Sequence, residues 1–338
     1  MKLILYSAVP DKILFSRVGF YRNDIEALSL HGDEVLATNS LTELFKFKPT
    51  LIVGYFFSWS VLAAILGRII GSRIILGGGG DQISPLLFTG YRLFIRRFVA
   101  FLGLLLSHRI LLSCTDDIIN IRKLCFGIRK LENKIELVNH VVVATPLPQI
   151  PRAPITGEFH AFTLCWMGAE SNVRRKGVDK AIQLIAKLRA IGVDASLDVG
   201  GTDGPGRKFL EKLAAELNVI ESIRFLGAIS DEKKNDYFAR GSIYMQLSEH
   251  EGFGVAAAEA FFSGMIVVHS NMGGLRDVIG EHGLVLRPEL IQQADTIWTR
   301  AFYNNFLQYR INSDFLKKNI LKYSIQMRSN AFLRDGNT

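Results

Sequence analysis

Two carboxylates flank a glycine-rich turn in the stretch SEHEGFGVAAAEAFFSG, which runs from Ser248 to Gly264. Glu251 lies directly before Gly-Phe-Gly, and Glu259 lies eight residues later in an alanine-rich apolar run. The preceding residues, IYMQLS, read as a strand, so this loop is expected at the carboxyl edge of a parallel sheet, where doubly wound folds bind ligands. The helix that follows would direct free N–H groups and a positive dipole at an anion such as a diphosphate.

The two carboxylates are expected to have different tasks. Glu251, in the loop, can accept hydrogen bonds from hydroxyl groups, whereas Glu259 lies about five residues into the helix among small neighbours. That position leaves room for a ribose diol, a group that carboxylates commonly bind. A favourable contact with the helix dipole would also explain Glu251, but Glu259 is too far along the helix for it. His250 is interpreted as a ligand contact or as loop surface, and Asp277 as a cross-cleft contact or a helix cap.

Strand-like and helix-like segments alternate along the chain, which predicts an α/β fold with two successive, mostly parallel sheets. We expect one domain over residues 1–155, a second over 156–310, and a C-terminal helical segment over 311–338. Its helix, Phe315–Arg328, is expected to pack back on the first domain. The linker is expected at Ala144–Gly157, which holds four of the nine prolines. A helix is expected over Pro85–Leu106, and a lengthened loop between Gly168 and Lys176.

Composition narrows the class of protein. The 338 residues are 49% hydrophobic and 21% charged, which predicts large cores and excludes general disorder. The three cysteines show no CxxC spacing and are expected to be reduced, and no signal peptide is evident at the start of the chain, so a cytoplasmic location is expected. Residues 1–155 carry 18 Lys and Arg against 11 Asp and Glu, a net charge of +7 within the total of +8. This asymmetry predicts an anionic partner for the N-terminal half.

One basic and aromatic helix stands out in that half. Arg92, Arg96 and Arg97 lie among phenylalanines and leucines in LLFTGYRLFIRRFVAFLGLLLSHR. Two interpretations are open: a buried crossover helix with one solvated edge, or an interfacial helix on an anionic membrane surface. No nucleic-acid motif accompanies the arginines, so nucleic acid is not an expected partner. The apolar stretch at 51–76 is punctuated by Gly54, Arg68 and Gly71 and is expected to be strand, helix and strand rather than a span.

The stretch EGFGVAAAEAFFSGMIVVHSNMGGLRDVI resembles the signature of the family 4 retaining glycosyltransferases, which have two facing Rossmann-like domains in the GT-B architecture. Glu251 and Glu259 match the Glu-x7-Glu motif of that family. The resemblance extends upstream through RRKGVDKAIQLIAKL and LDVGGTDGPG and covers most of residues 162–288. It implies transfer of a sugar from a nucleotide-sugar donor to a glycan or lipid-linked acceptor, with retention, in cell-surface polysaccharide synthesis.

The resemblance also implies roles for particular residues. Glu251 would contact hydroxyl groups of the donor sugar, and Glu259 would bind the ribose. Phe253 and Gly254 would offer backbone N–H groups, and Lys176 would hold the diphosphate. Gly200, Gly201 and Leu226 would line the phosphate and base pockets. No metal or other cofactor is implied, because cations and a helix N-terminus can neutralise the leaving diphosphate.

The chain departs from the family pattern in three places, one of which is the short and weakly patterned portion after Pro288. Relatives often have an arginine after the glycine that ends the first strand of the second domain, where this chain has Gly168 and Ala169. We expect Arg174 or Arg175 to substitute for it. Relatives also often have a histidine near the position of the glycine run at 77–80. Its absence keeps an alternative open, a non-catalytic sugar-nucleotide-binding subunit that supports a partner enzyme. The glycine run itself is interpreted as a close backbone approach to ligand or as a strand-end turn.

Overall fold

The protein is described by a computed structural model that covers residues 1–57, 59–78, 83–85, 88–149 and 151–334. The chain divides into two compact units. The N-terminal unit comprises Met1–Val141 and Leu321–Thr338, and the second unit comprises Val142–Ile320. Within the described residues each unit is built on one six-stranded sheet in which all paired strands are parallel. The predicted α/β fold with two successive parallel sheets is therefore confirmed.

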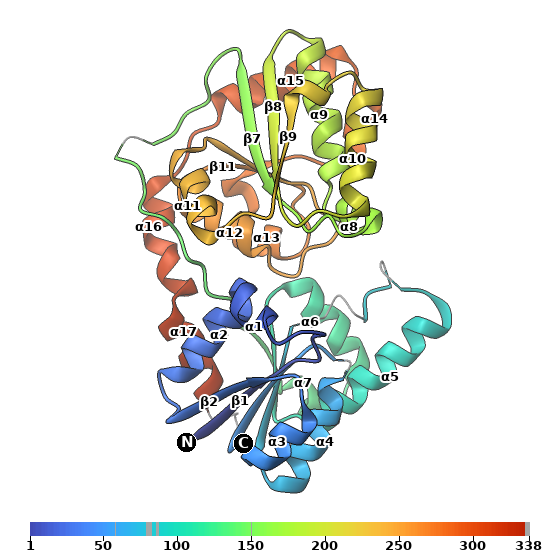
Figure 1. The fold of residues 1–338 in the computed structure, drawn as a ribbon, viewed down its shortest axis with the longest axis vertical. Helices are drawn as coiled ribbons and strands as arrows, with labels where there is room; N and C mark the ends of the chain where they lie inside the picture. Colours follow the sequence, from blue (N-terminus) through green and yellow to red (C-terminus); the bar gives the residue numbers. More distant parts are fainter. Residues whose placement is uncertain (58, 79–82, 86–87, 150, 335–338) are drawn as a thin grey trace. The chain divides into compact units, whose positions relative to one another are not determined.

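The N-terminal unit has the strand order β2-β1-β3-β4-β5-β6, with helices on both faces of the sheet (Figure 1). Its central strands are continuous apolar runs, as expected for parallel strands that are covered on both sides. The bounds are β1 Lys2–Tyr6, α1 Leu14–Arg17, α2 Gly19–Ser29, β2 Glu34–Thr38, α3 Leu41–Phe47, β3 Leu51–Tyr55, α4 Ser60–Ile70, β4 Arg73–Gly77, α5 Gly90–Leu106, β5 Arg109–Leu112, α6 Thr115–Arg122, α7 Arg129–Glu132, β6 Ile135–Leu137 and α17 Ile325–Leu333.

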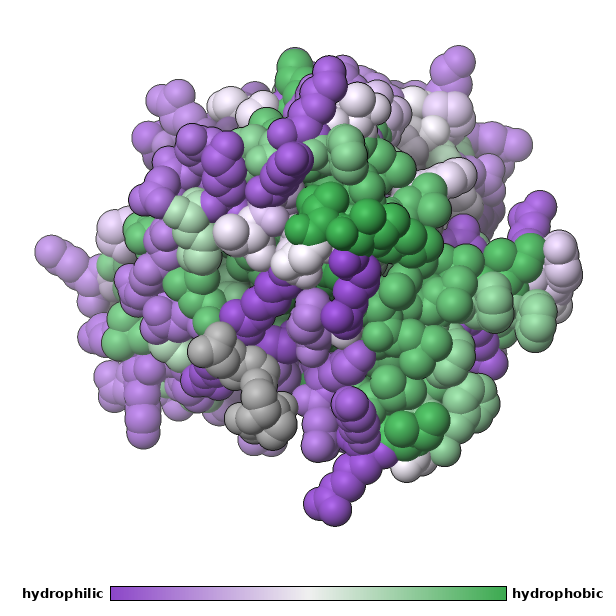
Figure 2. Space-filling model, turned by 90° about the horizontal axis from the view of Figure 1, so that it is seen from below, coloured by the Kyte–Doolittle hydropathy of each residue, from purple (hydrophilic) through white to green (hydrophobic). Residues whose placement is uncertain are grey.

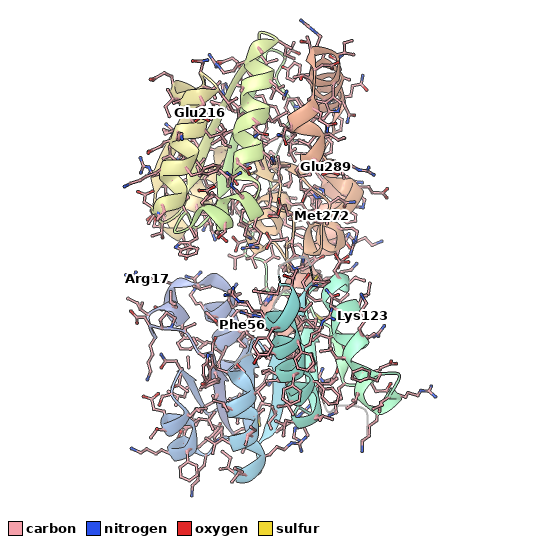
Figure 3. All side chains as sticks on the ribbon, turned by 90° about the vertical axis from the view of Figure 1, so that its right-hand side faces the viewer. Arg17, Phe56, Lys123, Glu216, Met272 and Glu289 are labelled. Carbon is pink, nitrogen blue, oxygen red and sulfur yellow. The ribbon has the colours of Figure 1, made fainter. Side chains whose placement is uncertain are left out.

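The second unit has the strand order β12-β11-β10-β7-β8-β9. Figure 3 shows side chains filling the layers between the ribbons of each unit, and Glu216 marks the end of α10 there. The bounds are β7 Glu158–Leu164, α8 Glu170–Arg175, α9 Val178–Ala190, β8 Asp194–Gly200, α10 Pro205–Glu216, β9 Ile223–Gly227, α11 Asp231–Arg240, β10 Ile243–Gln246, α12 Val255–Phe262, β11 Ile266–His269, α13 Gly274–Val278, β12 Leu284–Val285, α14 Pro288–Gln293, α15 Thr296–Gln308 and α16 Ser313–Asn319.

The division between the units falls before the proline-rich segment and not at residue 155. This segment packs on the second unit, because the backbone N–H of Thr145 donates to Ser263 Oγ at 2.9 Å and Arg152 donates to the carbonyl oxygen of Phe238 at 2.8 Å. The proline-rich stretch is therefore part of the second unit, and the chain crosses between the units at Val141 and Val142.

Three expected elements differ from the structure. The segment expected as a lengthened loop after Gly168 is helix α8, which a salt bridge between Glu170 and Arg174 stabilises at i,i+4 spacing. Helix α5 begins at Gly90 and not at Pro85. The expected final helix Phe315–Arg328 is divided, because Ser324 caps a new helix, α17, by accepting a hydrogen bond from the backbone N–H of Met327. Residues 79–82 of the glycine-rich segment lie outside the described part of the chain.

Helix α17 belongs to the N-terminal unit, where it packs against α2. Its Arg328 is buried and forms two hydrogen bonds of 2.8 Å to the buried carboxylate of Asp24. Tyr55 also donates a hydrogen bond to Asp24. Burial disfavours the charge of the guanidinium, but the adjacent carboxylate of Asp24 more than compensates and raises the pKa of Arg328 above its ordinary value. The ion pair thus ties α17 into the N-terminal unit.

We predict that Arg328→Ala lowers the free energy of unfolding of the N-terminal unit by about 3–5 kcal/mol, because it leaves the Asp24 charge buried without its main partner. Urea unfolding followed by circular dichroism measures this effect. Met327→Ala, an exposed position on the same helix, should change stability by no more than about 0.5 kcal/mol. Equal losses for the two variants would contradict a role for the ion pair.

Candidate functional site at the carboxyl edge of the second sheet

The order of strands in the second unit fixes where a ligand site is expected. From β7 the sheet extends through β8 and β9 in one direction and through β10, β11 and β12 in the other. The strand order therefore reverses between β7 and β10, and ligands of open α/β sheets bind outside the carboxyl ends of strands at such a switch point. The segment after β7 carries Lys176, and the loop after β10 carries Glu251.

These two segments are brought together by close backbone packing. Gly177, between α8 and α9, has φ 70°, and a Cβ atom added there would lie 2.0 Å from the carbonyl oxygen of Leu247. Only glycine therefore fits at this position. The backbone N–H of Glu249 also donates to the carbonyl oxygen of Arg175 at 2.8 Å. The contacts fix the loop after β10 against the end of α8.

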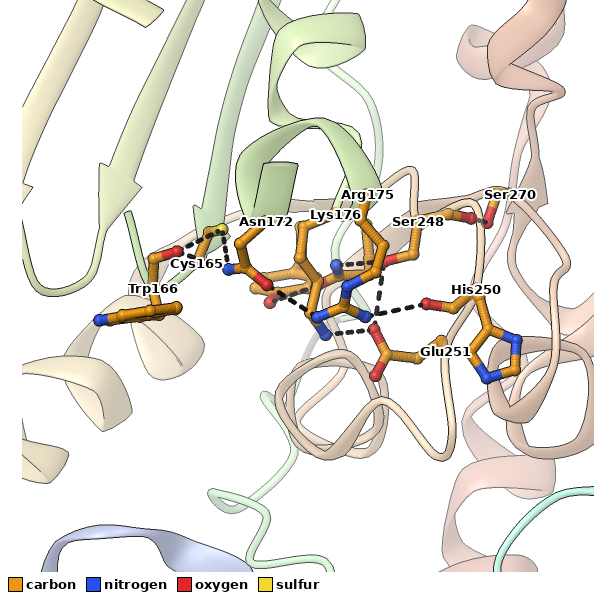
Figure 4. A network of polar contacts seen from close by, with 11 residues as sticks. Cys165, Trp166, Asn172, Arg175, Lys176, Ser248, His250, Glu251 and Ser270 are labelled. Carbon is orange, nitrogen blue, oxygen red and sulfur yellow. Dashed lines mark hydrogen bonds and ion pairs between the residues drawn. The ribbon is translucent and has the colours of Figure 1, made fainter. Parts of the chain in front are cut away.

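Lys176 and Glu251 form the centre of the site (Figure 4). The ammonium of Lys176 donates to Glu251 Oε2 at 2.6 Å, and Glu251 is only 8% exposed. Burial alone would raise the pKa of the Glu251 carboxyl group, but the charge and hydrogen bond of Lys176, with Arg175 nearby, lower it below its ordinary value. Glu251 is therefore a buried carboxylate that is ionised at neutral pH, a suitable acceptor for hydroxyl groups.

A chain of buried hydrogen bonds holds the Glu251 carboxylate from the sheet side. Tyr244, on β10, donates to the side-chain oxygen of Gln246 at 3.2 Å, Gln246 donates to Ser248 Oγ at 2.7 Å, and Ser248 donates to Glu251 Oε2 at 3.1 Å. The hydroxyl of Ser270 donates to the carbonyl oxygen of Ser248 at 2.6 Å and so contacts the backbone of the same loop. Gln246 and Ser248 were not predicted as site residues, although they lie two residues apart at the end of the expected strand IYMQLS.

The two arginines of α8 are directed to different places. Arg175 donates to Asn172 Oδ1 at 2.8 Å and to the carbonyl oxygen of His250 at 3.4 Å, so it lies in the network around Glu251 (Figure 4). Arg174 pairs with Glu170 and stacks over the ring of Phe209 on α10. The structure thus brings Arg175 into the site and turns Arg174 away from it. That one of them contacts a phosphate remains a prediction.

Glu259 has a lysine partner that sequence reasoning missed. It is buried on α12, where Lys234 of α11 donates to its Oε2 at 2.8 Å. Lys234 also lies 3.3 Å from Asp231 on its own helix. The charge pattern DEKK at the start of α11 gave no signal for this pairing, because the two partners are 25 residues apart in the sequence. Each predicted carboxylate therefore has its own ammonium partner.

The other predicted residues occupy the same edge of the sheet. Gly254 has φ 81° and caps the N-terminus of α12, and Phe253 before it is buried. Gly200 ends β8, and Gly201 donates its backbone N–H to the carbonyl oxygen of Gly227, next to Leu226 on β9. His250 is buried, so its interpretation as loop surface is wrong. Whether these residues contact a donor stays a prediction.

The structure resembles solved proteins with two Rossmann-like units. It superposes on Anabaena Alr3699/HepE in complex with UDP with a TM-score of 0.70 over 98% of both chains, at 14% identity. It also resembles the apo form of the trehalose-6-phosphate synthase OtsA, with a TM-score of 0.68 at 13% identity. Similarity at this level of identity establishes the fold, which is the GT-B fold of glycosyltransferases.

Residues 170–297, about two fifths of the chain, match the family model "Glycosyl transferases group 1". The chain is 28% identical over 140 residues to the phosphatidylinositol N-acetylglucosaminyltransferase gpi3 subunit of Schizosaccharomyces pombe, and 32% identical over 153 residues to protein CapJ of Staphylococcus aureus. These matches cover 41% and 45% of this chain, and only 30% and 38% of the two relatives.

His269 supports the same loop from the neighbouring strand, because it pairs in register with Gln246. Its Nδ1 accepts from the backbone N–H of Asn271 at 3.2 Å, and its Nε2 lies 3.0 Å from the carbonyl oxygen of Gly280. One acceptor and one donor nitrogen define a neutral imidazole. Burial lowers the pKa of His269 from 6.5 to about 4.

We predict that His269 makes the stability of the protein depend on pH. Between pH 6.5 and about 4 the unfolded chain binds a proton that the folded chain does not, so its contribution to stability is present above pH 6.5 and is lost as pH falls. The slope is about 1.4 kcal/mol per pH unit. Urea unfolding of His269→Asn at several pH values should show a smaller slope, whereas His31→Asn, at an exposed position, should keep it. An unchanged slope in His269→Asn would contradict this assignment.

Proposed function

We propose that the protein is a retaining glycosyltransferase of family 4 that moves a sugar from a nucleotide-sugar donor to a glycan or lipid-linked acceptor. The observation that carries this proposal is the pairing of the partly exposed Lys176 with the buried Glu251 at the switch point between β7 and β10. A donor has a diphosphate beside a sugar, and the pair offers a cation and a hydrogen-bond acceptor next to one another. The group 1 family match over residues 170–297 supports the same reaction class.

The residues of the site suit the parts of such a donor. Lys176 and Arg175 would meet the diphosphate, together with the backbone N–H groups at the start of α12. Glu251 would accept hydrogen bonds from the sugar hydroxyls, and Glu259 from the ribose. In this scheme donor binding replaces the ion pairs of Lys176 with Glu251 and of Lys234 with Glu259. Each carboxylate then accepts hydrogen bonds from donor hydroxyls in place of its ammonium, and Lys176 turns to the phosphates.

Charge develops on the leaving nucleotide diphosphate as the glycosidic bond breaks, and preorganised cations stabilise it. Lys176, Arg175 and the α12 N-terminus are the groups that would do so, and we propose that no metal ion is needed. The acceptor is proposed to be a glycan or a lipid-linked glycan in cell-surface polysaccharide synthesis. Several relatives bear names that refer to transfer onto phosphatidylinositol, which supports a lipid-linked acceptor.

The function is tested by measuring binding and turnover with a panel of nucleotide sugars. Substitutions of the two carboxylates should have different effects in these assays. Glu259→Ala should weaken binding of the free nucleotide and of the sugar donor by roughly ten- to a hundredfold, because a charged hydrogen bond to the ribose is lost. Glu251→Ala should spare the free nucleotide and reduce transfer. Calorimetric titration and turnover assays measure these effects. Equal effects on nucleotide affinity would contradict the division of roles, and binding without turnover for any acceptor would favour a non-catalytic subunit.

The arginines of α8 give a second test of the site. Arg175→Ala should lower turnover on the order of a hundredfold if its guanidinium meets the developing charge, as expected for a donor aimed at a transition state. Arg174→Ala is the matched control, because Arg174 pairs with Glu170 and stacks on Phe209. A loss of only a few fold in Arg175→Ala would show that Lys176 acts without an arginine companion.

We further propose that the protein binds the cytoplasmic face of an anionic membrane through Arg92, Arg96 and Arg97. No helix among the described residues is long and apolar enough to cross a bilayer. Helix α5 is buried at Ala100, Gly103 and Leu104, toward its C-terminal end. Its N-terminal half is largely exposed and includes phenylalanines, so this half is more exposed than a buried crossover helix with one solvated edge would be. An exposed helix of this composition suits a membrane interface.

Replacing these three arginines with glutamine should weaken binding to anionic vesicles by about a hundredfold, since each basic residue near such a surface contributes about 1 kcal/mol. Vesicle sedimentation measures the loss, and donor binding should be unchanged. A control variant with Lys208, Lys233 and Lys317 changed to glutamine removes the same charge from exposed positions of the second unit. Sedimentation that responds neither to the arginine substitutions nor to high salt would refute electrostatic attachment.

A further inference from the structure

The N-terminal unit has a cavity of about 550 Å³ beside α5, within the range of roughly 300–1,000 Å³ that is typical of small-molecule sites. Its position follows from the sheet. Phe57 follows the carboxyl end of β3 and Ile83 follows that of β4, so the cavity lies at the edge where ligands of open α/β sheets bind. The apolar side chains that line it, among the described residues, are Phe57, Trp59, Ile83, Phe88, Ile95 and Val99.

Two arginines are also among the described residues that line the cavity. Arg92 and Arg96 are one turn apart on α5, so they share a helix face. The guanidinium of Arg96 lies 3.9 Å from the ring centre of Phe88, which holds it at the apolar wall. No carboxylate among the described residues pairs with Arg92 or Arg96, and α5 itself contains no Asp or Glu. In the part of the chain that the structure describes, these two cations thus lack a carboxylate partner at an apolar cavity, which favours an anionic group, and guanidinium forks suit phosphate oxygens.

Exposed apolar side chains surround this part of α5. Tyr91, Phe94 and Phe98 are 75%, 68% and 55% exposed. On α4, Leu62 and Ile69 are also exposed. Figure 2 shows hydrophobic side chains gathered on one side of the N-terminal unit, the side on which α4 and α5 lie in Figure 1. An apolar molecule that resides in a bilayer could therefore reach the cavity along an apolar surface.

We propose that this cavity binds the lipid part of the acceptor: an apolar chain whose head carries a phosphate. The chain would occupy the space between the aromatic side chains, and Arg92 and Arg96 would bind the phosphate. The inference rests on the proposed function, because it specifies the acceptor of that reaction. It also assigns Arg92 and Arg96 a task that Arg97, which does not line the cavity, does not share.

Binding of dodecyl phosphate, below the concentration at which it aggregates, tests the assignment. Saturable binding is expected for dodecyl phosphate, and much weaker binding for dodecanol and for inorganic phosphate, because each lacks one half of the ligand. Arg92→Gln and Arg96→Gln should each weaken binding by about tenfold. Arg97→Gln is the matched control on the same helix and should stay within about twofold. Equal losses in all three variants, or equal binding of dodecanol, would overturn the proposal.

A second pair of variants tests the cavity itself. Val99→Trp places a larger side chain at the lining and should reduce dodecyl phosphate binding by at least about tenfold, whereas Ile69→Trp adds the same surface on α4 outside the cavity and should not. Circular dichroism confirms that both variants are folded. Unchanged binding in folded Val99→Trp would overturn the proposal.

Failure of this inference and failure of the proposed function are distinguishable. If the protein binds and turns over a nucleotide sugar but shows no saturable binding of dodecyl phosphate, the proposed function stands and the lipid site is refuted. If the protein binds dodecyl phosphate with the expected dependence on Arg92 and Arg96 but binds no nucleotide sugar, the lipid site stands and the proposed function is refuted.

Discussion

The negative charge of Glu251, held almost out of contact with water, is the constraint on which the local architecture of the second unit depends. A buried carboxylate is costly unless cations and hydrogen-bond donors surround it. Lys176 supplies the cation, and Ser248 supplies a hydroxyl that is itself held by Gln246. These groups come from both sides of the point where strand order reverses. The switch point of the sheet is therefore also the place where opposite charges can be assembled from two distant segments.

The two units offer different chemistry at the carboxyl edges of similar sheets. In the second unit the edge is polar, with two carboxylates that each contact a lysine. In the N-terminal unit the edge beside α5 is aromatic and aliphatic, and the charged groups among the described residues of the cavity lining are Arg92 and Arg96. The same parallel fold thus supports a polar site in one half of the chain and an apolar, cationic one in the other. The sequence also differs between the two halves, because residues 1–155 carry a net charge of +7 within the total of +8.

Much of this arrangement could be predicted from sequence, for identifiable reasons. The alternation of strand-like and helix-like segments predicted both sheets. The apolar stretch at 51–76 was predicted as strand, helix and strand because glycines and an arginine punctuate it, and it forms β3, α4 and β4. Glu251 and Glu259 stood out because an acid in an apolar stretch has few structural explanations. Lys234 did not stand out, because tertiary packing brings it to Glu259 from 25 residues away. Gln246 was not predicted either, although its partners Tyr244 and Ser248 lie two residues away on each side. Helix α8 was missed because one short turn, stabilised by the Glu170–Arg174 pair, has no apolar period of its own.

The pairing of Asp24 with Arg328 has a consequence for how the chain is made. The two residues are separated by 304 positions, with the whole second unit between them. Domains generally fold in the order in which they leave the ribosome. Here the first-synthesised sheet must wait for its last helix, so the second unit has been translated in full before Asp24 can meet its guanidinium partner. During that interval a buried acid of the N-terminal unit lacks its counter-ion, and the half that is translated first is the half that is completed last.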